Sequence, residues 1–249
     1  MDVLEALRAE TGVVAVVGAG GKKTTLYALA RRAARETNGR VVVTATVRIP
    51  PFDRRVAQVL LTDDPAAALE ETTSWPVGVV PERDGADRYG GYDPTVVDRL
   101  AETGSADLVL VKADGARTRE FKAPGDREPR LPRRVDTVIP IASVRAVGSP
   151  LSADHVHRPE RVAAITGRDR GDPIRPGDVA RVLASERGGL KGVPDGATVV
   201  PLLNKVDDDD LRAVATEIAT ELLERAPSVE RVVLARMIAD DPVVEVVEA

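Results

Sequence analysis

The sequence predicts an α/β fold in which a mostly parallel sheet is flanked by helices. Two observations support this class: short valine-rich runs recur along the 249 residues, and each run is followed by a helical pattern. Strands that are buried on both faces read as continuous apolar runs, and alternation of strand with helix is typical of a parallel sheet. We expect one domain over residues 1–249, with a less patterned insert around 144–196.

Six apolar runs are the expected strands. In chain order they are "VVAVV" before Gly18, "RVVVTAT" ending at Thr46, "ADLVLVKAD" ending at Asp114, "DTVIPIAS" ending at Ser143, "TVVPLLNKVD" ending at Asp207 and "RVVLARM" ending at Met237.

Three helices and two long loops connect these runs. The first helix is expected over Thr24–Glu36, with Asn38 and Gly39 as its C-terminal stop. A second is expected over Asp208–Glu224, because a run of aspartates suits the positive end of a helix dipole. Another begins near Pro159. The segments 81–94 and 117–132 are dense in glycine, proline and charge, and long loops of this kind in a compact domain are often functional.

Composition excludes several classes of function. Hydrophobic residues make up 43% of the chain, charged residues 30%, and the formal net charge is -5. The chain therefore lacks the broad positive field that nonspecific nucleic-acid binding requires. It has no cysteine, which excludes disulfides, thiolate metal sites and thiol nucleophiles. No apolar run approaches the length of a bilayer span, so we expect a cytoplasmic protein without a nucleic-acid or membrane partner.

A glycine-rich turn joins the first expected strand to the first helix. In "VVAVVGAGGKKTTLYALA", Gly18, Gly20 and Gly21 precede two lysines. A P-loop uses such a turn to direct backbone N–H groups at phosphate oxygens, while a lysine reaches the β and γ phosphates and a hydroxyl holds Mg²⁺. The segment predicts a P-loop NTPase-like site.

The two lysines leave the register of this loop open. If Lys23 is the phosphate lysine, Thr24 is the Mg²⁺ hydroxyl, but Lys22 occupies a position usually held by glycine. If Lys22 is the phosphate lysine, Gly21 precedes it correctly, but Lys23 displaces the hydroxyl and Thr24 or Thr25 must substitute. A glycine-rich turn with solvated lysines is the alternative to phosphate binding.

Two later segments favour a nucleotide. Asp114 follows a buried strand, where a P-loop enzyme usually carries the aspartate that binds Mg²⁺; a simple Asp-Gly turn is the alternative. The segment "LLNKVD" places Asn204, Lys205 and Asp207 in the NKxD pattern by which many GTPases read guanine, and this favours GTP over ATP. Ala235 is the candidate for a small residue near the base.

Polar residues also follow the second expected strand. Thr44, Thr46 and Arg48 lie where ligands bind in open α/β sheets, although β-branched residues favour strands in any case. The two histidines, His155 and His157, are more simply explained as surface residues of a loop than as metal ligands.

Together these segments resemble the YqeC family. The resemblance runs in order from about Val13 to Asp207 and is most specific in "ADGAR", "KAP", "VHRPE" and "LNKVD". The family is named for an accessory role to selenium-dependent hydroxylases or for selenium cofactor biosynthesis. It implies a nucleotide-binding accessory protein that helps to mature or insert a selenium-containing cofactor of molybdenum hydroxylases, with purine nucleotide, Mg²⁺ and such a hydroxylase as partners.

The resemblance also implies site residues. A gap-free match favours Lys22 as the phosphate lysine; Lys23 replaces a threonine of the family pattern and Lys112 replaces a glutamate. The matching positions are Gly18, Gly20, Gly21, Lys22, Thr24, Thr44, Thr46, Asp114, Gly115, Arg117, Lys122, Glu128, His157, Arg158 and Glu160.

Three functions are compatible with these residues. The first is an NTPase that prefers GTP, in which Lys22 or Lys23 holds the phosphates and Thr24 and Asp114 hold Mg²⁺. The second is a small-molecule kinase or activating transferase, and the third is a nucleotide-responsive binding module without turnover. Candidates for contact with substrate or partner are Arg48, Arg117, Lys122, Glu128, His157 and Arg158.

Overall fold

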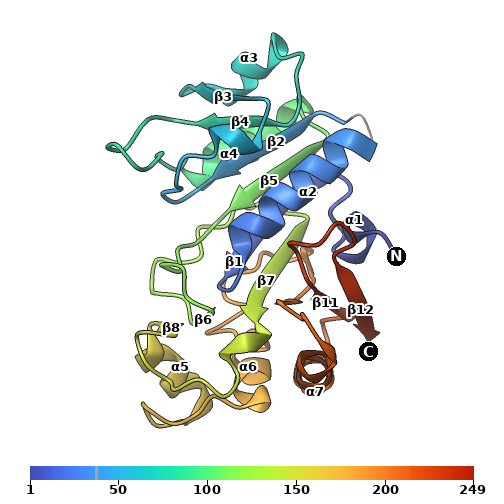
Figure 1. Ribbon diagram of the computed structural model, residues 1–249. Helices are drawn as coiled ribbons and strands as arrows, with labels where there is room; N and C mark the ends of the chain where they lie inside the picture. Colours follow the sequence, from blue (N-terminus) through green and yellow to red (C-terminus); the bar gives the residue numbers. More distant parts are fainter. Residues whose placement is uncertain (37–38) are drawn as a thin grey trace.

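The computed structural model describes residues 1–36 and 39–249, and within them a ten-stranded sheet forms the centre of the molecule (Figure 1). The strand order is β12-β11-β10-β7-β1-β5-β2-β4-β3, with β9 paired to β7 beside this path. The pairs are parallel except that of β11 with β12. The predicted α/β class with a mostly parallel sheet and flanking helices is confirmed.

The elements have the following bounds. The strands are β1 (Gly12–Gly18), β2 (Val41–Ala45), β3 (Gln58–Leu61), β4 (Val77–Val80), β5 (Leu108–Lys112), β7 (Thr137–Ser143), β9 (Thr198–Val199), β10 (Leu202–Asn204), β11 (Arg231–Ala235) and β12 (Val243–Glu248), with β6 (Phe121–Lys122) and β8 (Val156–His157) in a second small sheet. The helices are α1 (Val3–Ala6), α2 (Lys22–Glu36), α3 (Pro65–Glu70), α4 (Pro94–Thr103), α5 (Pro159–Thr166), α6 (Pro176–Leu183) and α7 (Asp209–Arg225), with short 3-10 turns at Asp53–Arg55 and Val144–Ala146.

Each of the six expected apolar runs contains a strand, but one run contains two. The run "TVVPLLNKVD" divides into β9 and β10 around Pro201, which has no amide for a sheet ladder. Helix α7 begins one residue after Asp208, whose side chain accepts from the Leu211 amide at 2.8 Å, so the aspartate run caps the helix as predicted. The predicted stop at Asn38 lies outside the described residues. Strands β3, β4, β6, β8 and β12 were not expected.

Helices cover both faces of the sheet. Val14 and Val16 of β1 belong to one buried cluster with α1 and α2, whereas Val13 and Ala15 belong to another that includes α4. A third cluster joins α5, α6 and α7 to β10 and β11. The segment 144–196, which carried little pattern, holds α5 and α6, and α6 lies between α5 and α7 at the lower end of Figure 1.

The strand order determines where a ligand is expected. β1 lies between β5 and β7, and the chain passes from one side of β1 to the other between them. In open α/β sheets, ligands bind outside the carboxyl ends of the strands at such a reversal of strand order. The turn that follows β1 is therefore at the expected ligand-binding edge. Within the described part of the chain, no helix combines the length and apolar character needed to cross a bilayer.

Candidate functional site

The glycine loop, residues 18–21, connects β1 to α2 and depends on its glycines. The φ angles of its three glycines are 89°, 83° and 139°, in the region that residues with a side chain rarely adopt. A Cβ on Gly20 would also overlap Ser143, and a Cβ on Gly21 would overlap the amide of Asn204. The loop therefore needs glycine both for its backbone conformation and because the ends of β7 and β10 approach so closely.

Some amides of this loop are engaged and others are not. Ala19 and Gly20 donate to carbonyls of β7 and of the 117–120 segment, at 2.8 and 3.0 Å. The amide of Thr25 makes the first helical bond of α2. Between them, the amides of residues 21–24 bond to no acceptor in the described part of the chain. The first turn of α2 also contains no acidic residue. These four N–H groups at the positive end of a helix are available to an anion.

Beside the loop lies an ion cluster of Lys22, Asp114, Lys122, Glu128 and Arg158, of which the first three are buried and the last two half-buried. Asp114 is 1% exposed and accepts from the Gly18 amide at 2.8 Å and from Lys122 Nζ at 2.8 Å. Lys22 Nζ lies 3.0 Å from the other carboxylate oxygen and donates to the Gly18 carbonyl. Burial raises the pKa of Asp114, but the two ammonium groups outweigh it, so the pKa is lowered and the carboxylate is ionised.

The cluster extends from Lys122 toward the start of α5. Lys122 Nζ also donates to the Gly115 carbonyl at 2.6 Å and to Glu128 at 2.9 Å, which uses all three of its hydrogens. Arg158 donates to the same Glu128 oxygen at 2.7 Å. Burial opposes ionisation of Glu128, but Lys122 and Arg158 outweigh it and lower its pKa to about 2. His157 pairs with Lys122 across the small sheet, and burial, followed by the charge of Arg158, lowers its pKa to about 4.

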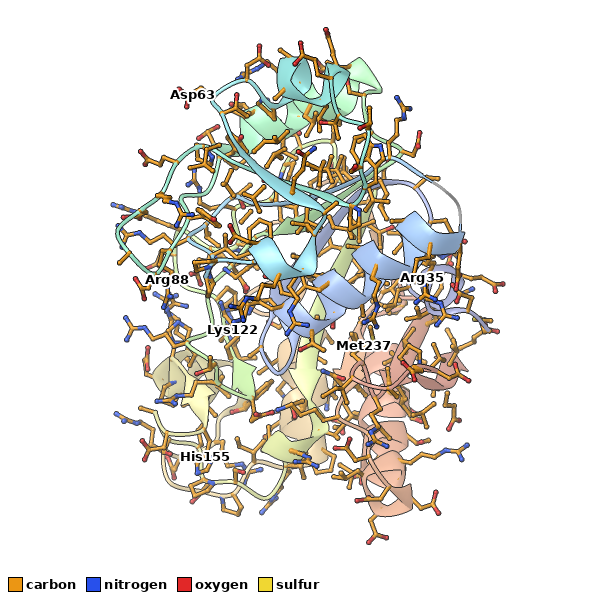
Figure 2. The ribbon with its side chains drawn as sticks, turned by 45° about the horizontal axis from the view of Figure 1, so that its top comes forward. Arg35, Asp63, Arg88, Lys122, His155 and Met237 are labelled. Carbon is orange, nitrogen blue, oxygen red and sulfur yellow. The ribbon has the colours of Figure 1, made fainter. Side chains whose placement is uncertain are left out.

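A cleft of ≈ 420 Å³ opens at the glycine loop. Residues 20–24 form one wall, and residues 115–120 with parts of the 48–50 and 81–94 segments form the other. In Figure 2, Arg88 lies to one side of Lys122 and Met237 to the other, across the region where α2 begins. The basic residues lining this cleft are Lys22, Lys23, Arg48, Arg88, Lys112, Arg117, Arg119 and Lys205. Glu120 is the one acid among the described lining residues, so the cleft favours anions.

Lys112 is the most deeply buried cation of the cleft that lies outside the ion cluster. It is 6% exposed, and its Nζ donates to the carbonyl of Arg48 at 3.0 Å. No carboxylate among the described residues pairs with it, and its two remaining N–H donors have no acceptor there. Burial and then the positive charge of Lys22 lower its pKa to about 8, so it remains mostly cationic at neutral pH.

Asn204 holds the glycine loop in place. Its side-chain amide donates to the carbonyl of Gly20 at 2.8 Å, and its side-chain oxygen accepts from the amide of Met237 at 3.1 Å. Ala235 is directly opposite Asn204 in the β10–β11 ladder. Asn204 therefore ties the loop after β1 to the segment after β11, and a small residue adjoins it.

The other two residues of the NKxD pattern lie differently. Lys205 lines the cleft, has a φ of 67°, and donates to both oxygens of Glu120 at 2.6 and 2.7 Å. Asp207 is paired with Arg145 at 2.8 Å and with Arg236 at 3.3 Å, and does not line the cleft. In this conformation Lys205 faces the cleft, whereas the carboxylate of Asp207 is bound by arginines.

The four candidate threonines divide into two pairs. The buried hydroxyls of Thr44 and Thr46 donate to backbone carbonyls at 2.8 and 2.6 Å, and neither residue lines the cleft. Thr24 is exposed and lines the cleft. Thr25 is buried, and its hydroxyl has no hydrogen-bond partner in the described part of the chain.

The donor set at the loop is compatible with Mg²⁺ on one condition. The described residues contain no group of three or more histidine, aspartate and glutamate side chains that could hold a metal. However, one buried oxygen of Asp114 has no hydrogen bond, and its neighbour is the Lys22 ammonium. Mg²⁺ prefers oxygen ligands and takes several from phosphates and water. Asp114 and the Thr24 hydroxyl fit this ion if Lys22 moves away.

The structure thus brings most predicted residues together, in two groups. Around the cleft lie Gly20, Gly21, Lys22, Lys23, Thr24, Arg48, Arg117 and Lys205, while the ion cluster and His157 lie beside it. Sequence reasoning did not select Arg88, Lys112 or Arg119 as site residues. The available signal for Arg88 and Arg119 was their position in the two long loops, 81–94 and 117–132.

Two comparisons with known proteins give a match. A family model described as "YqeC protein" matches residues 14–160, which include the glycine loop and the whole ion cluster. A curated relative, "Uncharacterized protein YqeC" of Escherichia coli (strain K12), is 29% identical over 195 residues. That alignment covers 78% of this chain and 75% of the relative.

Proposed function

Because the chain belongs to the YqeC family, we propose that its cationic cleft binds a purine nucleotide with Mg²⁺, with GTP preferred, as in a P-loop NTPase. The observation that carries the proposal is the set of four unpaired amides at residues 21–24, placed on the wall of a cleft with eight basic residues and one acid. Backbone N–H groups at a helix N-terminus bind phosphate oxygens, and the basic residues supply the opposite charge.

The neighbouring strands support a P-loop NTPase-like fold. β5, which leads to Asp114, pairs directly with β1, so the aspartate lies beside the glycine loop and bonds to its first amide. In this proposal Lys22 leaves Asp114 to contact the phosphates, and Lys23 lines the same wall. Asp114 and the hydroxyl of Thr24 hold Mg²⁺, which supplies charge neutralisation on the phosphates when bound.

Asn204 and its neighbours support a base site beyond the phosphates. Asn204 fixes the glycine loop, Lys205 lies at the cleft, and the small residue Ala235 is opposite Asn204 in the β10–β11 ladder. Guanine would be read by Asp207 after it exchanges its arginine partners for the base. This arrangement is the reason for preferring GTP over ATP.

The family resemblance extends the proposal to a biological role. We assign the protein an accessory function in selenium cofactor biosynthesis or in the insertion of that cofactor into molybdenum hydroxylases. The 117–132 loop is the proposed partner surface, because it contributes to the cleft and carries Lys122 of the ion cluster. Release of Lys22 from Asp114 changes the charge that Lys122 faces, which connects nucleotide binding to this loop.

Equilibrium binding tests the proposal. Wild-type protein titrated with GTP and with ATP, each with Mg²⁺, is expected to bind GTP more tightly, and Lys22→Met to lose at least tenfold in affinity. Lys23→Met is expected to lose less, and Thr24→Val, at an exposed position, to reduce the Mg²⁺ dependence. Arg133→Gln removes an exposed arginine without a partner among the described residues and serves as the control. Absence of binding at millimolar GTP and ATP would overturn the proposal.

A further inference from the structure

We propose that the cleft has a second anion subsite, for a small tetrahedral dianion such as phosphate or a phosphate monoester, formed by Lys112, Arg117 and Arg119. We call these three residues the cationic wall. The inference rests on the proposed function, because that proposal assigns the nucleotide phosphates to the amides of residues 21–24 in the same cleft.

The cations of the cleft divide into those with a carboxylate partner and those without. Four are paired: Lys22 with Asp114, Lys205 with Glu120, Arg48 with Asp84 and Arg88 with Asp87. Four have no such partner among the residues that the structure describes, namely Lys23, Lys112, Arg117 and Arg119. Lys23 follows Lys22 on the nucleotide wall, so the cationic wall remains unpaired after the nucleotide has bound.

Lys112 is the strongest evidence for a second ligand. A buried ammonium group is costly unless it is paired and hydrogen-bonded, and Lys112, which is 6% exposed, has one carbonyl as its acceptor among the described residues. It lines the cleft, so its free N–H donors are accessible to a ligand that enters there. An anion at this place supplies the counter-charge that the protein does not.

Backbone contacts and backbone conformation position the segment that carries Arg117 and Arg119. The amide of Gly20 donates to the carbonyl of Arg119 at 3.0 Å, which fixes this segment against the glycine loop. Arg117 and Thr118 adopt left-handed conformations, with φ of 47° and 59°, and Arg117 is exposed. Guanidinium groups bind phosphate and carboxylate oxygens alike through two parallel hydrogen bonds, and the three positive charges favour a dianion over a monovalent carboxylate.

Calorimetry with inorganic phosphate tests the inference. The full chain is first saturated with Mg²⁺ and a non-hydrolysable GTP analogue, and phosphate is then titrated. One phosphate per chain is expected to bind, sulfate to compete with it, and acetate not to compete. Lys112→Met and Arg117→Gln are each expected to weaken phosphate binding at least tenfold, and to weaken nucleotide binding by a smaller factor. Arg133→Gln, the matched exposed control, is expected to leave both unchanged.

The outcomes separate this inference from the proposed function. If the nucleotide analogue displaces phosphate, the cleft has a single anion site, and the inference fails while nucleotide binding stands. If both variants bind phosphate as the wild type does, the subsite is not at the cationic wall. If the analogue does not bind but phosphate binding still depends on Lys112 and Arg117, the proposed function fails and the subsite stands. Arg117→Gln, on an exposed loop position, keeps the test valid if Lys112→Met does not fold.

Discussion

The ion cluster and the cationic wall lie beside the same loop, but they differ in whether their charged side chains have partners of opposite charge. In the cluster, Asp114 and Glu128 each contact two basic side chains, and Lys122 uses every hydrogen it has. In the cationic wall, Lys112 is equally buried and has no carboxylate among the described residues. The first arrangement is complete without a ligand, whereas the second lacks a counter-charge.

This difference distinguishes charged residues that stabilise the fold from charged residues that are available to bind a ligand. Removing one member of a satisfied buried ion pair leaves its partner uncompensated, which is strongly destabilising. Removing a buried cation that has no partner removes a desolvation cost instead. The cluster is therefore expected to lose stability on mutation, and Lys112, the buried member of the wall, to give a gain in stability.

The largest expected effect is at Asp114. Asp114→Asn leaves the buried ammonium groups of Lys22 and Lys122 without their shared carboxylate, so we expect a loss of about 3–5 kcal/mol in the free energy of unfolding. Urea denaturation followed by circular dichroism measures it. Asp126→Asn removes one partner of an exposed ion pair with Arg161 and is the control, with little change expected. A similar small change for Asp114→Asn would show that the cluster is not structural.

The next effect has the opposite sign and is at Lys112. Its pKa is about 8 in the folded chain against an ordinary value of 10.5, because of burial and the charges of Lys22 and Lys122, with Asp114 and Glu128 opposing them. The unfolded chain therefore binds more protons between these values, and stability rises with pH across that window. Lys112→Met is expected to raise the free energy of unfolding at pH 7 by up to about 3 kcal/mol.

Denaturation of wild type and Lys112→Met between pH 7 and 11 checks this prediction. The gain from the substitution should shrink as the pH rises through 8 and disappear above 10.5, the ordinary value for lysine. A substitution that destabilises the protein at pH 7 would instead assign Lys112 a structural role.

The smallest effect is at Glu128 and concerns acid. Burial opposes its charge, but Lys122 and Arg158 lower its pKa to about 2, from an ordinary 4.5. Its contribution to stability is therefore present above pH 4.5 and is lost as the pH falls toward 2. Because the group is partly solvated, we expect about 1 kcal/mol. In Glu128→Gln, the free energy of unfolding should fall less steeply as the pH is lowered from 4.5 toward 2. An unchanged pH dependence would show that the ion pairs of Glu128 do not contribute to stability.

The local parts of this site were predictable from the sequence. A valine run, three glycines and a helical pattern are enough to predict β1, the glycine loop and α2, since each depends on nearby residues. The same holds for the aspartate run, whose first member Asp208 caps α7. Asp114 was predicted at the end of a buried strand because it closes the apolar run "ADLVLVKAD".

The partners of these residues were not predictable. Lys122 reads as a surface residue of a charged loop, but the small β6–β8 sheet holds it inside, against Asp114. Lys112 was visible as a departure from the family pattern, yet its burial beside a cleft depends on segments far apart in the chain. The antiparallel strand β12 was missed because its residues are only partly buried.

A crystal structure of the complex with Mg²⁺ and a non-hydrolysable GTP analogue tests nucleotide binding at the glycine loop most directly. In that complex the amides of residues 21–24 are expected to contact the phosphates, and Lys22 Nζ to leave Asp114 for the β and γ phosphates, while Lys122 stays on Asp114. If Lys22 remains on Asp114 and the phosphates lie away from the glycine loop, the proposed nucleotide site is wrong.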